Sequence, residues 1–114
     1  GRSDDMLVVP GRDGEPVMLL PLALSTVLED EAGVFCFQLR QTGQRDLQLL
    51  LGPEAPQTVA VRGHCRRLLA DFAAAQGAVG LRITTRVADA LPLERSGKLK
   101  RVVAAPGAAA KFRA

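Results

Sequence analysis

The chain contains no tryptophan and no tyrosine, and its four phenylalanines are its only aromatic residues. Proteins that bind single-stranded nucleic acid stack bases on exposed aromatic rings, so this composition argues against that class. The formal net charge of +3 and the isoelectric point near 9.4 are mildly basic. Such a charge suits a polyanionic ligand such as a nucleotide, coenzyme A or an acidic carrier protein, but it is too weak to indicate DNA binding.

Cysteine and histidine are also scarce. Cys36 falls in an apolar stretch and Cys65 on the apolar face of an expected helix, so we expect two buried thiols rather than a disulfide. His64 is the only histidine and lacks partners at the spacing of a zinc site. No apolar run is long enough to cross a membrane, and no signal peptide is visible. We therefore expect a cytoplasmic protein without a metal site.

The 114 residues are enough for one domain, and a hydrophobic content of 47% predicts a packed core. The first residue is Gly1 rather than an initiator methionine. We therefore expect a piece of a longer protein.

The first third of the chain predicts a hairpin followed by a short helix. Apolar stretches at residues 6–9 and 17–20 flank a turn that contains two glycines, which is typical of two paired strands. Pro21 suits the first position of a helix, where its missing N–H costs nothing. Gly33 suits the end of that helix.

The middle of the chain predicts two further strands. Residues 34–40 alternate, so that Phe35, Phe37 and Leu39 share one face of a strand. A Thr-Gly turn then leads into residues 46–51, which alternate again. The two segments are expected to pair as a hairpin.

The longest helix is expected from about residue 58 to residue 76. Its buried face is marked by apolar residues at helical spacing, namely Val61, Cys65, Leu68, Leu69, Phe72 and Ala75. Residues 81–87 then alternate between apolar and polar side chains, with Leu81, Ile83 and Val87 expected to point inward. This pattern predicts one more strand.

The element order ββαββαβ predicts an α+β fold. We expect a small three-stranded sheet with two helices on one face, and an N-terminal β-hairpin that stands apart from this sheet. No internal repeat and no second domain is visible in the sequence. Residues 104–114 are rich in alanine and are expected to form a flexible tail.

A basic turn follows the last expected strand. Pro92 cannot continue a strand ladder, and Gly97 favours a turn, which leaves Lys98 at the tip with Lys100 and Arg101 behind it. A lysine presented in this way can enter another surface and neutralise negative charge that develops there. On composition alone, the alternative interpretation is a solvated basic loop.

Two motifs at opposite ends of the chain resemble one enzyme family. Pro-x-x-x-Ser-Gly-Lys-x-x-Arg, which starts at Pro92, resembles the terminal lysine motif of the adenylate-forming superfamily of acyl-CoA synthetases, peptide-synthetase adenylation domains and luciferases. Gly-Arg-Ser-Asp-Asp-Met-Leu-Val-Val-Pro-Gly, which starts at Gly1, is similar to the hinge motif of that superfamily. The residues of this N-terminal motif are most similar to those of the branch of phenylacetate-CoA ligases and coenzyme F390 synthetases. The resemblance covers residues 1–103.

The resemblance implies that residues 1–103 are the mobile C-terminal lid domain of an ATP-dependent acid–thiol ligase. Such enzymes join a carboxylate to the α-phosphate of ATP and then transfer the acyl group to a thiol. Lys98 matches the catalytic lysine, which would stabilise negative charge on phosphoryl oxygens. Arg2 matches the nucleotide-binding arginine, whose fork of donors suits the ribose diol.

Three further roles follow from the same resemblance or from the basic charge. Asp4 matches the hinge about which the domain rotates between the two reactions. Gly11 matches the glycine that lines the pantetheine tunnel, where a missing side chain leaves room for a thin ligand. The cluster Arg62, Arg66 and Arg67 on the long helix is a candidate dock for the acceptor, or else a solvated helix face.

The resemblance also implies partners. An N-terminal adenylation domain would hold most of ATP, Mg²⁺ and the carboxylic acid substrate, and the acceptor would be coenzyme A or the phosphopantetheine of an acyl carrier protein. We expect the isolated chain to be inactive, because it has no ATP phosphate loop and no acid pocket. Departures from the family pattern at residues 93–94 and 12–16 leave the acceptor open.

The alternative, from a different class, is a stand-alone basic binding module with no catalysis, whose lysine loop contacts an acidic partner. Neither nucleic acid nor a membrane is an expected partner under either hypothesis.

Overall fold

The chain begins with an antiparallel hairpin of β1 (Leu7–Pro10) and β2 (Pro16–Leu19) in the computed structural model, which describes residues 4–53, 59–93 and 96–105. The short turn η1 (Arg12–Gly14) joins the two strands. The hairpin forms its own two-stranded sheet, as the sequence predicts. It is tied to the rest of the fold because the buried Gln41 donates from Nε2 to the carbonyl of Val8 at 2.9 Å.

The first helix starts at Pro21, as expected, but it is not α-helical throughout. The α-helix α1 (Pro21–Thr26) continues into a π-helical segment η2 (Val27–Glu31). Leu24 and Leu28 remain buried along the segment. Gly33 then takes a φ of +67°, which favours glycine, and ends the helix.

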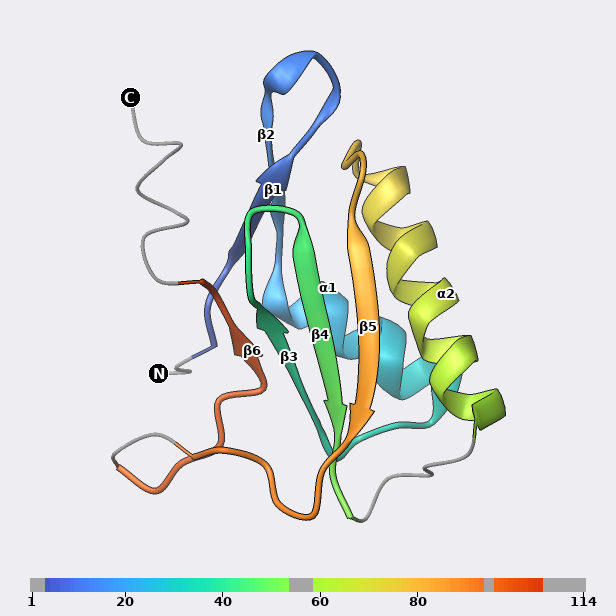
Figure 1. Ribbon diagram of the computed structural model, residues 1–114, viewed down its shortest axis with the longest axis vertical. Helices are drawn as coiled ribbons and strands as arrows, with labels where there is room; N and C mark the ends of the chain where they lie inside the picture. The colour runs from blue at the N-terminus through green and yellow to red at the C-terminus, as the bar shows by residue number, and fades with distance from the viewer. Residues whose placement is uncertain (1–3, 54–58, 94–95, 106–114) are drawn as a thin grey trace.

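The main sheet has four strands rather than the three that the sequence predicts. They are β3 (Phe37–Gln41), β4 (Asp46–Leu51), β5 (Arg82–Val87) and β6 (Val102–Val103), in the spatial order β5-β4-β3-β6 (Figure 1). Strands β3 and β4 are antiparallel, whereas β5 and β6 run parallel to their neighbours. The prediction missed β6 because two residues carry no recognisable alternation.

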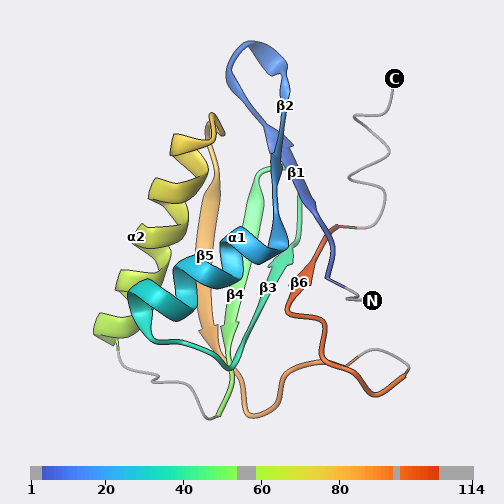
Figure 2. The same cartoon turned by 180° about the vertical axis from the view of Figure 1, so that it is seen from behind.

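Both helices lie on one face of this sheet, as Figure 2 shows. The long helix α2 (Val59–Ala75) buries Cys65, Leu69 and Ala73, which are spaced four residues apart. Ala75, which the sequence placed on the buried face, is exposed. The two cysteines are free thiols, and burial raises the pKa of Cys65.

The core lies between the helices and the sheet. Phe37 and Leu39 of β3 pack with three leucines of β4 in this core, namely Leu47, Leu49 and Leu51. Phe35 was expected on the same face, but it precedes β3 and is 64% exposed. Within the described residues, no helix is both long and apolar enough to cross a membrane.

Candidate functional site at the lysine loop

The lysine loop is the segment between Pro92 and Lys100, and one side chain holds both of these end residues. Gln38 of β3 donates from Nε2 to the carbonyl of Pro92 at 3.0 Å and to the carbonyl of Lys100 at 2.9 Å. Arg40 donates from Nη1 to Oε1 of Gln38 at 2.9 Å, which fixes the orientation of the amide. Because Gln38 is only 2% exposed, these bonds are shielded from water and anchor the loop to the sheet.

Lys98 lies at the exposed tip of this loop. Gly97 has a φ of +83°, so the predicted turn is confirmed. No ion pair joins Lys98 to another residue in the described part of the chain. Hollows of about 190 Å³ and 610 Å³ lie at the base of the loop and both include Arg40, but Lys98 lines neither. Lys98 therefore lies outside both of these hollows.

The other two cations of the motif are held by the fold. Lys100 pairs with Asp5, with Nζ 2.9 Å from Oδ1. Arg101 pairs with Glu29, with Nη2 2.8 Å from Oε2, and its guanidinium lies 4.3 Å from the ring centroid of Phe37. These contacts fix the segment directly after the loop.

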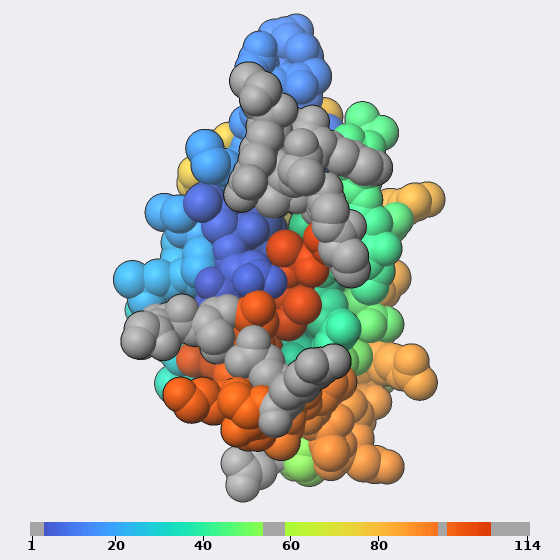
Figure 3. Space-filling view, turned by 90° about the vertical axis from the view of Figure 1, so that its left-hand side faces the viewer, coloured from blue at the N-terminus to red at the C-terminus, as the bar shows by residue number. Residues whose placement is uncertain are grey.

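Two adjacent aspartates cover the outer edge of β6. Oδ1 of Asp4 accepts the backbone N–H of Arg101 at 2.8 Å and that of Val102 at 3.3 Å. Asp5 donates its own N–H to the carbonyl of Val102 at 2.9 Å, and its Oδ2 accepts the N–H of Ala104 at 2.9 Å. We call this covered side of β6 the closed edge. Figure 3 shows the blue N-terminal segment directly against the red segment of β6.

The closed edge brings the two sequence motifs together. Asp4 and Asp5 come from the N-terminal motif, whereas Arg101 is the last residue of the lysine motif. The contacts join residues 97 and 98 positions apart. Arg2, the predicted nucleotide-binding residue, and residues 106–114 of the predicted tail lie outside the described residues.

Gly11 is buried at the top of β1, where the hairpin meets the end of α2. A Cβ atom at this position would lie 2.7 Å from the carbonyl oxygen of Glu15 and 2.6 Å from Cγ2 of Val17. The packing of this chain therefore requires a glycine here. This requirement is separate from the predicted role of Gly11 in a pantetheine tunnel, which stays a prediction.

The predicted basic cluster lies elsewhere, on α2. Arg62 is half-buried, whereas Arg66 and Arg67 are exposed. They line two hollows together with residues of β5, and no residue of the lysine loop lines either hollow. The structure does not bring the arginines and Lys98 into one site.

Sequence reasoning missed Gln38 and gave no role to Asp5 or Glu29. The expected alternation of residues 34–40 places Gln38 on the face opposite Phe37 and Leu39, and it predicts no partner for the amide. It is buried because the loop from a segment 54 residues away covers it. A signal existed for Asp5, since it belongs to the quoted N-terminal motif.

What the chain offers to a nucleotide is limited. Among the described residues, no group of three histidine, cysteine or acidic side chains could hold a metal ion. Lys98 could contribute one contact to a nucleotide site, because an exposed ammonium can reach a phosphate bound on another surface. Mg²⁺ and most of ATP would have to be held by other residues.

Comparisons of the chain with protein-family models, with curated proteins and with solved structures gave no match.

Proposed function

We propose that this chain is the mobile C-terminal domain of an ATP-dependent acid–thiol ligase of the adenylate-forming superfamily. In this proposal Lys98 enters the cleft of a larger adenylation domain that holds ATP, Mg²⁺ and a carboxylic acid. The domain then rotates at Asp4, and a pantetheine thiol of coenzyme A or of a carrier protein reaches the acyl group. Arg2 would contact the ribose, and Gly11 would line the path of the thiol.

One observation supports the proposal more than any other: the closed edge joins the hinge motif to the lysine motif. Asp4 accepts hydrogen bonds from Arg101 and Val102, which begin three residues after Lys98. The residue proposed as the pivot is therefore in direct contact with the segment that follows the lysine loop. Gln38 holds both ends of the loop to the sheet, so the loop would move with the domain.

The state of Lys98 agrees with this role. Its neighbours Lys100 and Arg101 are paired with carboxylates, whereas Lys98 is exposed at the loop tip. An ammonium transferred from water into a dry cleft interacts with a developing phosphoryl charge far more strongly than it does in water. ATP, when bound, supplies the electrophilic α-phosphate, and Lys98 would stabilise the negative charge on its oxygens.

A stand-alone basic binding module is the second candidate function. The basic cluster on α2 favours it, because the cluster lies with β5 and away from the lysine loop. Under the ligase proposal the same arginines dock the acceptor, whereas under the module hypothesis they dock a partner without any chemistry.

Lys98→Ala, made in the ligase that carries this domain, tests the proposal. We expect adenylation, measured as acid-dependent exchange of pyrophosphate into ATP, to fall by a factor equivalent to about 3–4 kcal/mol, which is typical of losing a transition-state donor. Folding should be unaffected, because an exposed loop lysine contributes little packing. Arg45→Ala, in the exposed β3–β4 turn, removes the same charge as a matched control. Exchange within a few-fold of wild type for Lys98→Ala would refute the catalytic role.

A further inference from the structure

Strand β5 is the other edge of the sheet, and it has outward-facing backbone groups. Arg82 donates its N–H to Arg45 at 2.8 Å, and Ala88 donates its N–H to Leu51 at 2.9 Å, so the even-numbered residues face β4. Backbone groups alternate in direction along a strand. The N–H and C=O groups of Ile83, Thr85 and Val87 therefore point away from the sheet. No described strand lies beyond them.

A groove runs along this edge between β5 and α2. The helix lies alongside β5 at the margin of the sheet (Figure 1). Two hollows of about 380 Å³ and 410 Å³ lie between them and share Arg66, Ile83 and Thr84. We call these two adjoining hollows the β5 groove. In the β5 groove, exposed side chains of α2 therefore lie next to the outward backbone groups of β5.

The charge in the β5 groove has one sign. Arg62, Arg66 and Arg67 line it, and none of its described lining residues is acidic. The Nε of Arg62 is buried without a hydrogen-bond partner in the described part of the chain. Arg66 and Arg67 are exposed, so a carboxylate entering the groove would meet charged donors.

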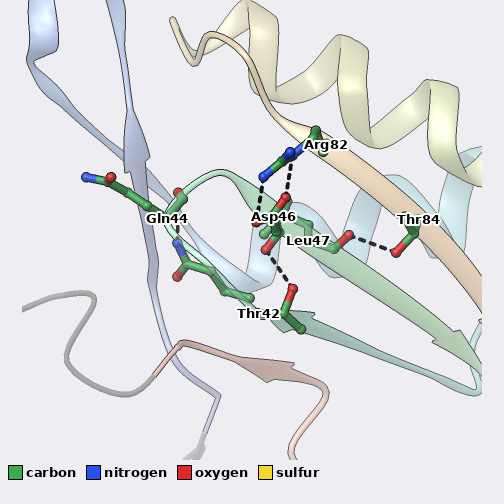
Figure 4. A network of polar contacts seen from close by, with 7 residues as sticks. Thr42, Gln44, Asp46, Leu47, Arg82 and Thr84 are labelled. Atoms are coloured by element: carbon green, nitrogen blue, oxygen red, sulfur yellow. Dashed lines mark hydrogen bonds and ion pairs between the residues drawn. The ribbon is translucent and has the colours of Figure 1, made fainter.

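Arg82 differs from these three arginines. Its Nε donates to Oδ1 of Asp46 at 2.6 Å and its Nη2 to Oδ2 at 3.1 Å (Figure 4). The hydrogen bond, together with the charge of Asp46, raises the pKa of Arg82. Arg82 is therefore already paired at the start of β5, and the helix arginines carry the attraction for a partner.

The spacing of the arginines fits an extended chain. Arg62 and Arg66 are four residues apart in α2, which is about 6 Å along the helix axis, and alternate residues of a strand are about 6.7 Å apart. We propose that the β5 groove binds an extended acidic segment of a partner protein, which adds to β5 as a fifth strand and places alternate carboxylates against Arg62 and Arg66. Backbone bonds would give affinity and the arginines selectivity. The proposal does not depend on ligase activity.

The test uses this chain and a fluorescent decapeptide of alternating glutamate and threonine. We expect saturable binding that slows hydrogen exchange at the amides of Ile83, Thr85 and Val87. Arg66→Glu should weaken binding about tenfold, because it sets like charges against each other in the groove. Arg12→Glu, on the exposed η1 turn, makes the same charge change as the matched control and should leave the affinity unchanged.

Two N-methylated peptides separate strand addition from simple charge attraction. One is methylated at the glutamate amides and the other at the threonine amides, and both keep the parent charge. Because the amides on one side of an added strand must face β5, one of the two should lose binding. Equal binding of all three peptides, unchanged exchange at the three β5 amides, or no binding would overturn the proposal. Coenzyme A that displaces the peptide and binds equally tightly, without protecting those amides, would instead identify a phosphate site and also overturn it.

Discussion

The two edges of the sheet are finished in opposite ways. At the closed edge, Asp4 and Asp5 satisfy the outward backbone groups of β6. At the other edge, the outward groups of β5 face a groove lined by Arg62 and Arg66. An edge strand with unpaired backbone groups is a template for another chain, and only the β6 edge is covered from within the described residues.

The charged side chains at the two edges differ in what they can bind. Carboxylates at the closed edge accept backbone N–H groups and fix the position of the lysine loop, so this edge is internal architecture. Guanidinium groups beside β5 cannot accept hydrogen bonds from its N–H groups, so that edge remains available. The negative side chains therefore close one edge, and we propose that the positive side chains attract a partner to the other.

The largest predicted loss of stability comes from breaking the closed edge with Asp4→Ala. The N–H groups of Arg101 and Val102 lose their shared acceptor, and a partly buried group without a partner costs about 1–3 kcal/mol. We expect a fall of about 2–3 kcal/mol in the free energy of unfolding, measured by urea denaturation. Asp71→Ala, at an exposed position of α2, should change it little. Equal effects of the two substitutions would show that the closed edge carries no stability.

A pair of glycine substitutions should act in opposite directions. Gly11→Ala places a Cβ against the backbone of Glu15 and should destabilise the domain by about 2 kcal/mol through overpacking. Gly63→Ala, in α2 beside the β5 groove, meets only Nη1 of Arg67 at 3.7 Å. It should stabilise the helix by roughly 0.5–1 kcal/mol. We expect the melting temperature to fall for Gly11→Ala and to rise for Gly63→Ala. A fall for both variants, or for neither, would contradict the close packing at Gly11 and the open space at Gly63.

Gln38→Leu should destabilise the domain less than Asp4→Ala or Gly11→Ala, and it should have a specific effect on the loop. It removes the two hydrogen bonds that the buried amide donates to the loop and the one that it accepts from Arg40, at a net cost of about 1 kcal/mol. Hydrogen exchange should accelerate across residues 96–101 while β5 keeps its protection. Gln48→Leu, on β4, removes an amide of the same size from a half-buried position and should leave loop exchange unchanged. Acceleration shared by both variants would mean that Gln38 is not the anchor.

The strands and helices with clear periodicity could be predicted from the sequence, whereas the closed edge could not. The alternation of Leu47, Leu49 and Leu51 fixes both β4 and its buried face. Strand β6 exists only because β3 and the two aspartates pair with it, so its stabilising partners are remote in sequence. The burial of Gln38 could not be predicted for the same reason, since nothing local indicates that the carbonyls of Pro92 and Lys100 accept its hydrogen bonds.

The candidate site shows a similar division. The turn at Gly97 and the exposure of Lys98 follow from local sequence and are confirmed. The pairing of Lys100 with Asp5, and of Arg101 with Glu29, needed the folded chain. The sequence predicts that Lys98, Lys100 and Arg101 form one basic loop. In the fold, Lys100 and Arg101 are paired with carboxylates, and of these three cations only Lys98 is exposed.

The central claim is that Asp4 and Lys98 serve different half-reactions of one rotating domain. The most direct measurement compares pyrophosphate exchange with thioester formation from a supplied acyl-adenylate, in the full-length protein that we propose to be a ligase. Asp4→Pro fixes the backbone φ near −65° and removes one N–H, so it should retain exchange and block thioester formation if the frozen state is the adenylation pose. Lys98→Ala should lose exchange and retain transfer. Asp4→Ala, which removes the carboxylate but leaves the backbone free to rotate, controls for loss of the closed edge and should form thioester. Thioester formation at the wild-type rate by Asp4→Pro, or loss of the same half-reaction alone by Asp4→Pro and Lys98→Ala, would contradict the account.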